Sequence, residues 1–372
     1  MRNPFANLFS LFTARGTESV VGVDFGSSSL KVVQLKKKGG QAILETYGAV
    51  ALGPYVGMEA GRAARLPNAT LAEALRDVLR EAKVTATECG VAVPMSGSLI
   101  AAITLPVRHG QDVSALIPIE ARKYIPTPIS EVKLDWRVLS KPGTPAVSEQ
   151  AGSLSNAVPN AESEKTDVLI TAVHRDVLER LKGVCADAAL VPSFFEIESF
   201  STERAASPAP DAVLGVIDIG ASAAKISIMD SGTLRDAHTV NRGGQDMTLA
   251  LSSSLGIPIA EAEEQKRNGA PRAGDQLASA VLSRIFGEAR AVFSHYEARA
   301  GRVLVGIVFS GGGSLSFGLL AEAEKAFSLP ITLIDPMVQL AAPAFLLPLL
   351  ARAGPEFAVA IGVALRRLEE VR

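Results

Sequence analysis

The chain has 372 residues, which is enough for two or three domains. It is 48% hydrophobic and 20% charged with a net charge of −2, which excludes a disordered chain and a protein that binds nucleic acid through bulk positive charge. The two cysteines, Cys89 and Cys185, lie far apart without a second metal ligand in register. This argues against a disulfide scaffold and a cysteine-type zinc site, and for a reducing compartment.

Residues 1–19 are expected to form a leader. Phe and Leu are frequent between Arg2 and Arg15, but a continuous apolar core and a small-residue cleavage site are missing, so this is not a secretory signal. Two interpretations stay open: a short amphipathic segment on a membrane or partner, and a frayed end. The longest charge-free apolar stretch, 336–351, is shorter than the ~20 residues of a spanning helix and contains prolines. We therefore expect a cytoplasmic protein.

Residues 20–33 are expected to form a β-hairpin whose turn can hold an anion. Asp24 ends the first strand, Gly26 lets the backbone approach an anion without a Cβ in the way, and Lys31 supplies positive charge. The turn also offers backbone N–H groups and the hydroxyl groups of Ser27, Ser28 and Ser29. Because an acid repels phosphate unless a cation lies between them, the hairpin predicts Mg²⁺ held largely through water.

The first domain is expected at residues 20–93 and 175–212, with a subdomain inserted at 94–174. Hydrophobic patterns predict strands at 91–93, 99–105, 134–139 and 168–173 and helices at 70–83, 175–190 and 192–204. Within the insert, residues 140–166 are rich in Pro, Ser, Ala, Gly and Asn and nearly lack large apolar side chains. This composition predicts a flexible loop.

The pattern of the first hairpin returns at residues 214–227. Four of its positions recur at a constant offset of 194 residues, as Asp218, Gly220, Ser222 and Lys225. A repeat of this kind predicts a duplicated fold with a site between its halves, in which Asp218 is the second acid near Mg²⁺. The second domain is expected at 213–345. Its turn contains Ala221 and Ala223 and so offers fewer hydroxyl donors than the first.

Two further segments of the second half are candidate binding elements. Glu263 and Lys266 share a face of a helix over 259–267, where they either bracket a ribose or adenine or form an ordinary surface ion pair. A triple glycine between a buried strand and a helix leaves room for a flat ring against the backbone; its residues are Gly311, Gly312 and Gly313, followed by Ser314. This segment also imitates a dinucleotide fingerprint, but the third glycine of that motif is absent. A last helix, 357–370 within the segment 346–372, is expected to return to the first domain.

Together these motifs resemble the actin-like ATPase superfamily, which includes actin, Hsp70, sugar kinases and FtsA, over nearly the whole chain. The resemblance implies an α/β fold of two duplicated RNase H-like domains around a cleft for ATP and Mg²⁺. The hairpins would grip the phosphates, and the late glycines and the charged helix would hold adenosine, with Gly243 and Gly244 added to the nucleotide-binding residues. In this superfamily a carboxylate between the halves orients the attacking water. Here Glu198 is the candidate, acting with Asp24, which works through Mg²⁺; a polar helix start that includes Glu196 is the alternative.

Residues 119–136 narrow the resemblance. A helix that ends in Tyr124-Ile-Pro-Thr-Pro128 and is followed by Glu131 and Asp135 is similar to PilM, the actin-like protein of type IV pilus assembly. The resemblance implies an FtsA-like inserted subdomain, a place at the cytoplasmic side of the inner membrane, and a groove for the cytoplasmic tail of a PilN-like protein. It also allows contacts with other platform proteins and assembly ATPases, and at most slow ATP hydrolysis.

Two other functions fit parts of the sequence. A small-molecule kinase of the same superfamily would need a substrate pocket and an acidic base, and the insert offers no Asp beside clustered polar residues. An FtsA-like membrane-tethered filament would need an amphipathic C-terminal helix, and the tail 364–372 is too short and too closely tied to the fold.

Overall fold

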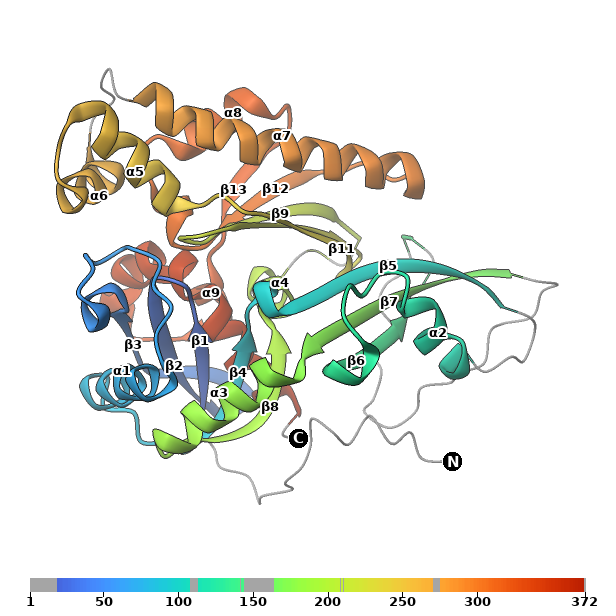
Figure 1. The fold of residues 1–372 in the computed structure, drawn as a ribbon, viewed down its shortest axis with the longest axis horizontal. Helices are drawn as coiled ribbons and strands as arrows, with labels where there is room; N and C mark the ends of the chain where they lie inside the picture. Colours follow the sequence, from blue (N-terminus) through green and yellow to red (C-terminus); the bar gives the residue numbers. More distant parts are fainter. Residues whose placement is uncertain are drawn as a thin grey trace.

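The computed structural model describes residues 19–107, 113–140, 142–143, 164–207, 209, 211–269 and 275–370 (Figure 1). The expected leader, apart from Ser19, and nearly all of the loop expected at 140–166 lie outside these residues. The chain folds around two large sheets, and a small third sheet extends sideways from the first domain (Figure 1).

A six-stranded sheet forms the core of the first domain. Its strands and helices are β1 Ser19–Phe25, β2 Ser29–Lys38, β3 Gln41–Ala51, α1 Asn68–Glu81, β4 Glu88–Val93, α3 Arg175–Asp187, β8 Val191–Ile197, α4 Glu198–Ala206, β14 Leu340–Ala341 and α9 Leu347–Glu370. The strand order is β14-β3-β2-β1-β4-β8. β1 and β2 pair antiparallel, with Asp24 opposite Lys31. Because α1 and α3 cover one face and α9 the other, β1 and β4 are apolar over most of their length.

The inserted subdomain is a small antiparallel sheet with one short helix. Its elements are β5 Ser98–Val107, α2 Ile117–Ala121, β6 Val132–Val138 and β7 Glu164–His174. β7 is the central strand, in the order β5-β7-β6. Residues of one face, among them Val168 and Ile170, pack with Ile117 of α2 in a separate apolar cluster. The other face of β7 is turned toward the first domain.

The second domain repeats the hairpin and sheet of the first. Its elements are β9 Val213–Ile219, β10 Ala224–Asp230, β11 Thr233–Val240, α5 Gly244–Leu255, α6 Ile259–Asn268, α7 Asp275–Ala300, β12 Gly306–Ser310, α8 Leu319–Ala326 and β13 Ile331–Leu333. The strand order is β11-β10-β9-β12-β13, and Asp218 stands opposite Lys225 in the β9–β10 hairpin. α7 and α8 cover the outer face of the sheet (Figure 1). The other face of the sheet is turned toward α4 of the first domain.

Short 3-10 turns connect several of these elements. They lie at Gly53–Val56, Met95–Gly97, Val113–Ala115, Ile129–Glu131, Gly312–Leu315, Pro336–Gln339 and Ala344–Leu346.

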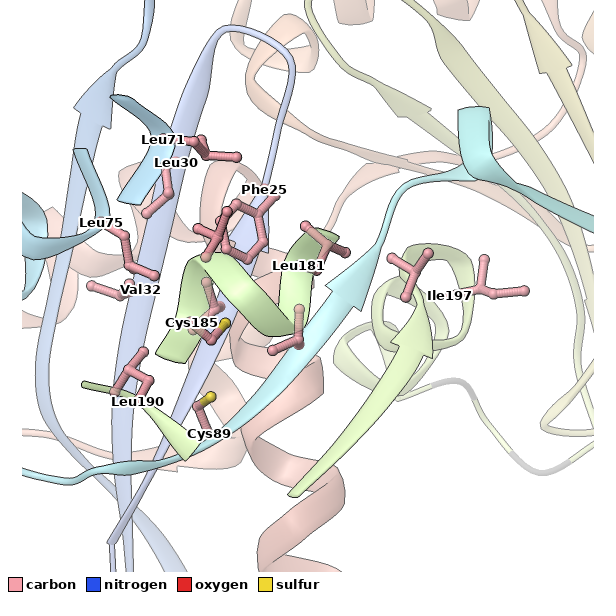
Figure 2. Close-up of a cluster of buried hydrophobic side chains, with 14 of the residues drawn as sticks. Phe25, Leu30, Val32, Leu71, Leu75, Cys89, Leu181, Cys185, Leu190 and Ile197 are labelled. Atoms are coloured by element: carbon pink, nitrogen blue, oxygen red, sulfur yellow. The ribbon is translucent and has the colours of Figure 1, made fainter. Parts of the chain in front are cut away.

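Both cysteines are buried in the apolar core of the first domain (Figure 2). Cys89 lies on β4 and Cys185 on α3, and both are free thiols. The contact with Cys185 and burial raise the pKa of the Cys89 thiol well above its ordinary value. The two thiols therefore serve packing between the sheet and α3.

Helix α9 is a core helix that joins the sheet to α4. With the turn before it, it is long and apolar enough to span a membrane by composition, with a mean hydropathy of 1.5 over its most apolar window. However, its residues from Phe357 to Leu365 are all buried in the fold. Glycines permit this close packing: a Cβ at Gly22 would overlap the carbonyl oxygen of Ala360, and one at Gly362 that of Ser201.

The structure confirms the predicted fold class and corrects some local expectations. Residues 192–197 belong to strand β8 instead of a helix, because they alternate beside β4, and the helix begins only at Glu198. The segment at Leu340–Ala341 pairs with β3, so the return to the first sheet precedes the boundary expected at 345. The last helix begins at Leu347 and not at Phe357. Pro355 therefore lies inside the helix and not before it.

Candidate functional site

A cavity of about 330 Å³ lies between the two domains and is lined by both hairpins. It collects most of the residues expected from the sequence: Asp24, Gly26, Ser27, Ser28, Ser29, Lys31, Glu198, Asp218, Gly220, Ala221, Ser222, Lys225, Gly244, Glu263, Lys266, Gly311, Gly312 and Gly313. We call this cavity the interdomain cleft. The repeat found in the sequence thus becomes two hairpins that face the same space.

The first hairpin turn carries the hydroxyl groups of the cleft. Asp24 and Lys31 are both buried, and Lys31 Nζ lies 3.5 Å from Asp24 Oδ2. The turn is held from behind, because the backbone N–H groups of Leu52 and Ala64 donate to the carbonyl oxygens of Ser28 and Ser27. Its backbone N–H groups and serine hydroxyls can therefore bind an anion in the cleft.

Gly26 is required by the shape of the first turn. A Cβ at this position would lie 2.6 Å from the carbonyl oxygen of Ser29, closer than real Cβ contacts. The tight turn brings the backbone up to the cleft and leaves no room for a side chain.

The second hairpin turn is held by its backbone instead. Gly220 N–H donates to Ala223, and the N–H groups of Gly244 and Gln245 donate to the carbonyl oxygens of Gly220 and Ala221, each at 2.9 Å. These bonds tie the turn to the start of α5. The positive end of the α5 dipole and the turn therefore meet at the cleft, where they favour an anion.

Gly243 acts behind this contact. A Cβ on Gly243 would crowd the carbonyl oxygens of Gly220 and Ala221, and its N–H donates to Asp246 in a capping box. Although it was expected to bind nucleotide, it does not line the cleft. It positions α5 against the turn.

Glu198 connects α4 of the first domain to the second hairpin through Lys225. Lys225 Nζ lies 3.0 Å from Glu198 Oε2 and 3.3 Å from Asp218 Oδ2. The backbone N–H of Met95 donates to Glu198 Oε1 at 2.7 Å, which fixes the carboxylate at the first residue of α4. The position of Glu198 in the cleft is therefore set by both domains and by the start of the insert.

Burial and neighbouring charges shift the pKa values of this group. Burial raises the pKa of Glu198 above its ordinary value, and Asp218 and Asp24 add to the increase, while Lys225 opposes it. Burial disfavours the charged form of Lys225, but Asp218 and Glu198 together raise the pKa of its ammonium group. A buried cluster of three carboxylates and a lysine is typical of sites that place charge for chemistry or for a charged ligand.

The triple glycine passes close to the second hairpin. Gly311 has a φ of 82°, and a Cβ there would overlap the carboxylate of Asp218. A Cβ on Gly313 would overlap the side chain of Ile219. Ser314 does not line the cleft, although it was expected to; its hydroxyl group donates to the carbonyl oxygen of Gly311 at 2.6 Å and supports the turn.

Glu263 and Lys266 form a partly buried ion pair at the cleft wall and not a solvated one. Lys266 Nζ lies 2.6 Å from Glu263 Oε2 and 3.2 Å from the carbonyl oxygen of Gly244. Thr248 of α5 also donates to Glu263 at 2.6 Å. The pair thus ties α6 to α5 while its polar atoms remain at the cleft.

Several cleft residues escaped the sequence reasoning. They are Gly61, Pro94, Met95, Ser96, Ala223, Thr239, Asn241, Gln245, Arg267, Pro355, Glu356 and Val359, together with Phe25 beside the first turn. Asn241 and Gln245 flank the double glycine at 243–244, which is a usable signal. The cleft residues on α9 have no such signal in the sequence, because they reach the cleft only through the packing of a helix that is distant along the chain.

The carboxylates fit a hydrated magnesium ion and not a protein cage. Mg²⁺ in nucleotide sites keeps several waters and is bound by one or two carboxylates and by phosphates. Asp24 and Asp218 would supply those carboxylates; each lies near the end of the first strand of its hairpin, β1 or β9. Within the described residues no group of three or more His, Cys, Asp or Glu side chains is arranged to hold a metal directly. Asp24 and Asp218 would hold a hydrated Mg²⁺ here, and its positive charge would offset that of bound phosphates.

A second cavity of about 210 Å³ lies between the inserted subdomain and the first domain. Its apolar surface comes mainly from Leu169 and Val173 of β7, Phe195 of β8 and Phe200 of α4. Charged residues of β6 and Arg366 of α9 stand beside them. We call this cavity the insert groove. Sequence reasoning expected a groove in the first half without naming its residues.

The fold and the cleft define the class of protein. Two sheets related by a repeat, each with an Asp-x-Gly hairpin that faces a shared cleft, form an actin-like ATPase fold. The family model of the type IV pilus assembly protein PilM matches residues 22–368. The chain therefore belongs to the PilM family, as its motifs predicted.

Comparisons with solved structures agree. This chain is similar to a chain in the solved structure of a PilM-PilN type IV pilus biogenesis complex. The TM-score is 0.76 and the identity is 25%, over 94% of this chain and 98% of the other. MreB 5 of Spiroplasma citri bound to AMPPNP has a TM-score of 0.52 and 11% identity over 95% of this chain and 98% of its own, and shows the fold alone.

A curated relative is more distant. The cell division protein FtsA of Neisseria meningitidis serogroup B is 28% identical over an alignment of 145 residues, and the match covers 31% of this chain and 34% of FtsA. The chain thus matches about a third of the length of that relative.

Proposed function

We propose that this protein is a nucleotide-dependent scaffold of type IV pilus assembly at the cytoplasmic side of the inner membrane. It binds ATP with Mg²⁺ in the interdomain cleft and the cytoplasmic tail of a PilN-like protein in the insert groove. The observation that carries the nucleotide part is that both hairpins, Glu198 and the triple glycine line one cavity. A bound nucleotide would touch both domains and so fix their separation.

The cleft divides into a phosphate end and a nucleoside end. The two turns present backbone N–H groups, hydroxyls and the lysines Lys31 and Lys225, which suit phosphates. Gly311 and Gly312 present bare backbone beside Glu263 and Lys266, which suits a ribose and a flat base. Glu198, fixed by Met95, lies where it can orient a water toward the terminal phosphate. We expect this arrangement to support slow ATP hydrolysis at most.

Contacts between the domains give closure a route to the insert groove. Across the cleft, Gln245 Oε1 accepts from the backbone N–H of Ala63 at 2.8 Å. At the other side of the second domain, Arg235 Nη1 donates to the carbonyl oxygen of Ser140 at 2.6 Å, just past β6 of the insert. A shift of the second domain would therefore move β6, which forms one wall of the groove. A bound nucleotide can change the affinity of the groove for the PilN-like tail only to the extent that the nucleotide binds the closed state more tightly than the open state.

The insert groove supports the partner part of the proposal. The solved relative with 25% identity is a complex of PilM with PilN. The groove is apolar at its floor and open to solvent, which suits a short peptide with apolar anchors. Its size of about 210 Å³ accommodates a few side chains and not a folded domain.

A groove-filling variant tests the proposal. Thr171 lines the groove, so Thr171→Arg should weaken binding of a synthetic PilN tail peptide at least tenfold by fluorescence anisotropy. Thr104→Arg, at an exposed threonine of the same sheet, is the matched control and should bind normally. Mg²⁺ and ATP should change the affinity of the wild type for the peptide. If both variants bind the peptide equally well, the insert groove is not the binding site of the tail. If nucleotide leaves the affinity of the wild type unchanged, nucleotide binding is not coupled to tail binding.

A further inference from the structure

The wall of the insert groove on β6 carries alternating charge. Val132 and Leu134 pack toward α2 in the core of the inserted subdomain. The period of two along a strand therefore turns Lys133, Asp135 and Arg137 to the other face, and all three line the groove. They stand above the apolar floor formed by β7, β8 and α4.

Glu196 shows how a carboxylate of this groove is satisfied. It accepts from Arg204 at 2.7 and 2.9 Å, from Arg366 at 3.0 Å and from Ser201 at 2.7 Å. Although burial opposes its charged form, these partners lower the pKa of Glu196. Its charge is fully used inside the protein, and so is that of Arg366, which also pairs with Glu370.

Asp135 lacks comparable partners. Its carboxylate accepts from the backbone N–H of Trp136 at 2.9 Å, and among the described residues no cation lies within ion-pair distance of it. Burial raises its pKa, while the hydrogen bond from Trp136 and the charges of Lys133 and Arg366 oppose the increase. A half-buried carboxylate of this kind gains most from a cation that arrives with a ligand.

We infer that Asp135 determines the specificity of the insert groove by accepting a Lys or Arg side chain of the bound tail, whose apolar neighbours lie on Leu169, Phe195 and Phe200. The inference rests on the proposed function and adds the chemistry of the partner. Two other cations of the groove already lie beside carboxylates of their own, so the cation nearest Asp135 along β6 is Lys133. Arg366 is paired with Glu196 and Glu370, and Arg137 lies near Glu203.

A double-mutant cycle tests the inference. The probes are the synthetic PilN tail peptide and copies of it in which each Lys is replaced by norleucine or each Arg by citrulline, one at a time. The proteins are the wild type, Asp135→Asn and the control Asp167→Asn, an exposed aspartate of β7 outside the groove. Binding is measured by anisotropy at two salt concentrations.

We expect Asp135→Asn to weaken binding of the parent peptide about tenfold or more. One neutral substitution in the peptide should cost the wild type the same factor and cost Asp135→Asn almost nothing. Asp167→Asn should bind like the wild type. Because Asp135→Asn removes a charge that burial disfavours, its melting temperature should equal or exceed that of the wild type.

Other outcomes overturn the inference in distinguishable ways. If the wild type binds the peptide but no neutral substitution couples to Asp135, the inference fails and the proposed function stands. If acidic substitutions in the peptide strengthen binding, the groove reads an anion through Lys133 or Arg137 and the inference is wrong. If the wild type does not bind the peptide at all, the partner part of the proposed function fails with it.

Discussion

The two hairpins share a backbone plan but stabilise their turns and their charges differently. The first has three serines in its turn, and Lys31 has Asp24 at 3.5 Å as its ion-pair partner. The second has a single serine between alanines, is tied to α5 by its backbone, and its lysine contacts both Asp218 and Glu198. Under the proposed function, the first hairpin would supply side-chain donors for the nucleotide, while the second would link the nucleotide to the arrangement of the domains.

The largest difference is expected between the two lysines. Lys225→Met leaves the buried carboxylates of Asp218 and Glu198 without their cation and should cost about 3 kcal/mol of unfolding free energy. Lys31→Met leaves only Asp24 and should cost about half as much. Urea unfolding with unchanged m-values measures both, and Glu198→Gln should restore part of the loss in Lys225→Met. Equal losses for the two lysines would break the comparison.

The turn glycines should differ by a smaller amount. A Cβ at Gly26 would lie 2.6 Å from the carbonyl oxygen of Ser29, whereas one at Gly220 would lie 3.1 Å from that of Ala223. Gly26→Ala should therefore cost about 2 kcal/mol and Gly220→Ala about 1 kcal/mol. Urea unfolding measures both losses. Gly183→Ala is the control, because a Cβ at Gly183 meets open space. A larger loss at Gly220 would mean that the second turn is the tighter one.

The helix that delivers Glu198 predicts a dependence on pH. At the far end of α4, Glu203 has a buried Oε1 without a hydrogen-bond partner, and burial raises the pKa of this residue from 4.5 to about 8. Below pH 4.5 both the folded and unfolded chains are protonated here. As the pH rises to about 8, only the unfolded chain releases the proton, so the folded state loses stability.

Glu203→Gln removes this loss. Its stability should equal that of the wild type near pH 4.5 and increasingly exceed it as the pH rises to 8, measured by thermal unfolding across this range. Glu131→Gln, at an exposed glutamate, should follow the wild type. A difference that does not change with pH would show that Glu203 is not the titrating group.

The last comparison between the two turns concerns their hydroxyl groups. Replacing Ser27, Ser28 and Ser29 by alanine one at a time should weaken ATP binding, about tenfold for the most affected position. Ser222→Ala in the second turn should weaken it about threefold at most. Competition with a fluorescent ATP analogue measures both, and a larger effect at Ser222 would reverse the roles given to the two turns.

The sequence was most informative where chemistry is local. Asp24, Gly26 and Lys31 and their repeat in the second half predicted both hairpins and their meeting in one cleft, because the spacing within a hairpin fixes which residues face each other. Glu198 was also selected, although the segment before it is a strand. In that segment the polar positions at Glu196 and Glu198 suit a strand end and a helix start equally well.

Contacts that depend on long-range packing could not be predicted from the sequence. Glu356 and Val359 reach the cleft because Gly22 and Gly362 let α9 lie close to β1 and α4, which no local pattern reveals. Gly243 and Ser314 lie outside the cleft lining for a related reason. Their residue types suit ligand binding, but in the fold they support the turns that face the cleft.

Isothermal titration of the full-length protein with ATP, with Mg²⁺ and with EDTA, tests the central claim most directly. Wild type, Asp24→Asn and Asp218→Asn should be compared, with Asp167→Asn as the control. We predict binding by the wild type and the control that depends on Mg²⁺, and affinity at least tenfold weaker in both cleft variants. Absence of binding by the folded wild type, or undiminished binding by both cleft variants, would contradict the account.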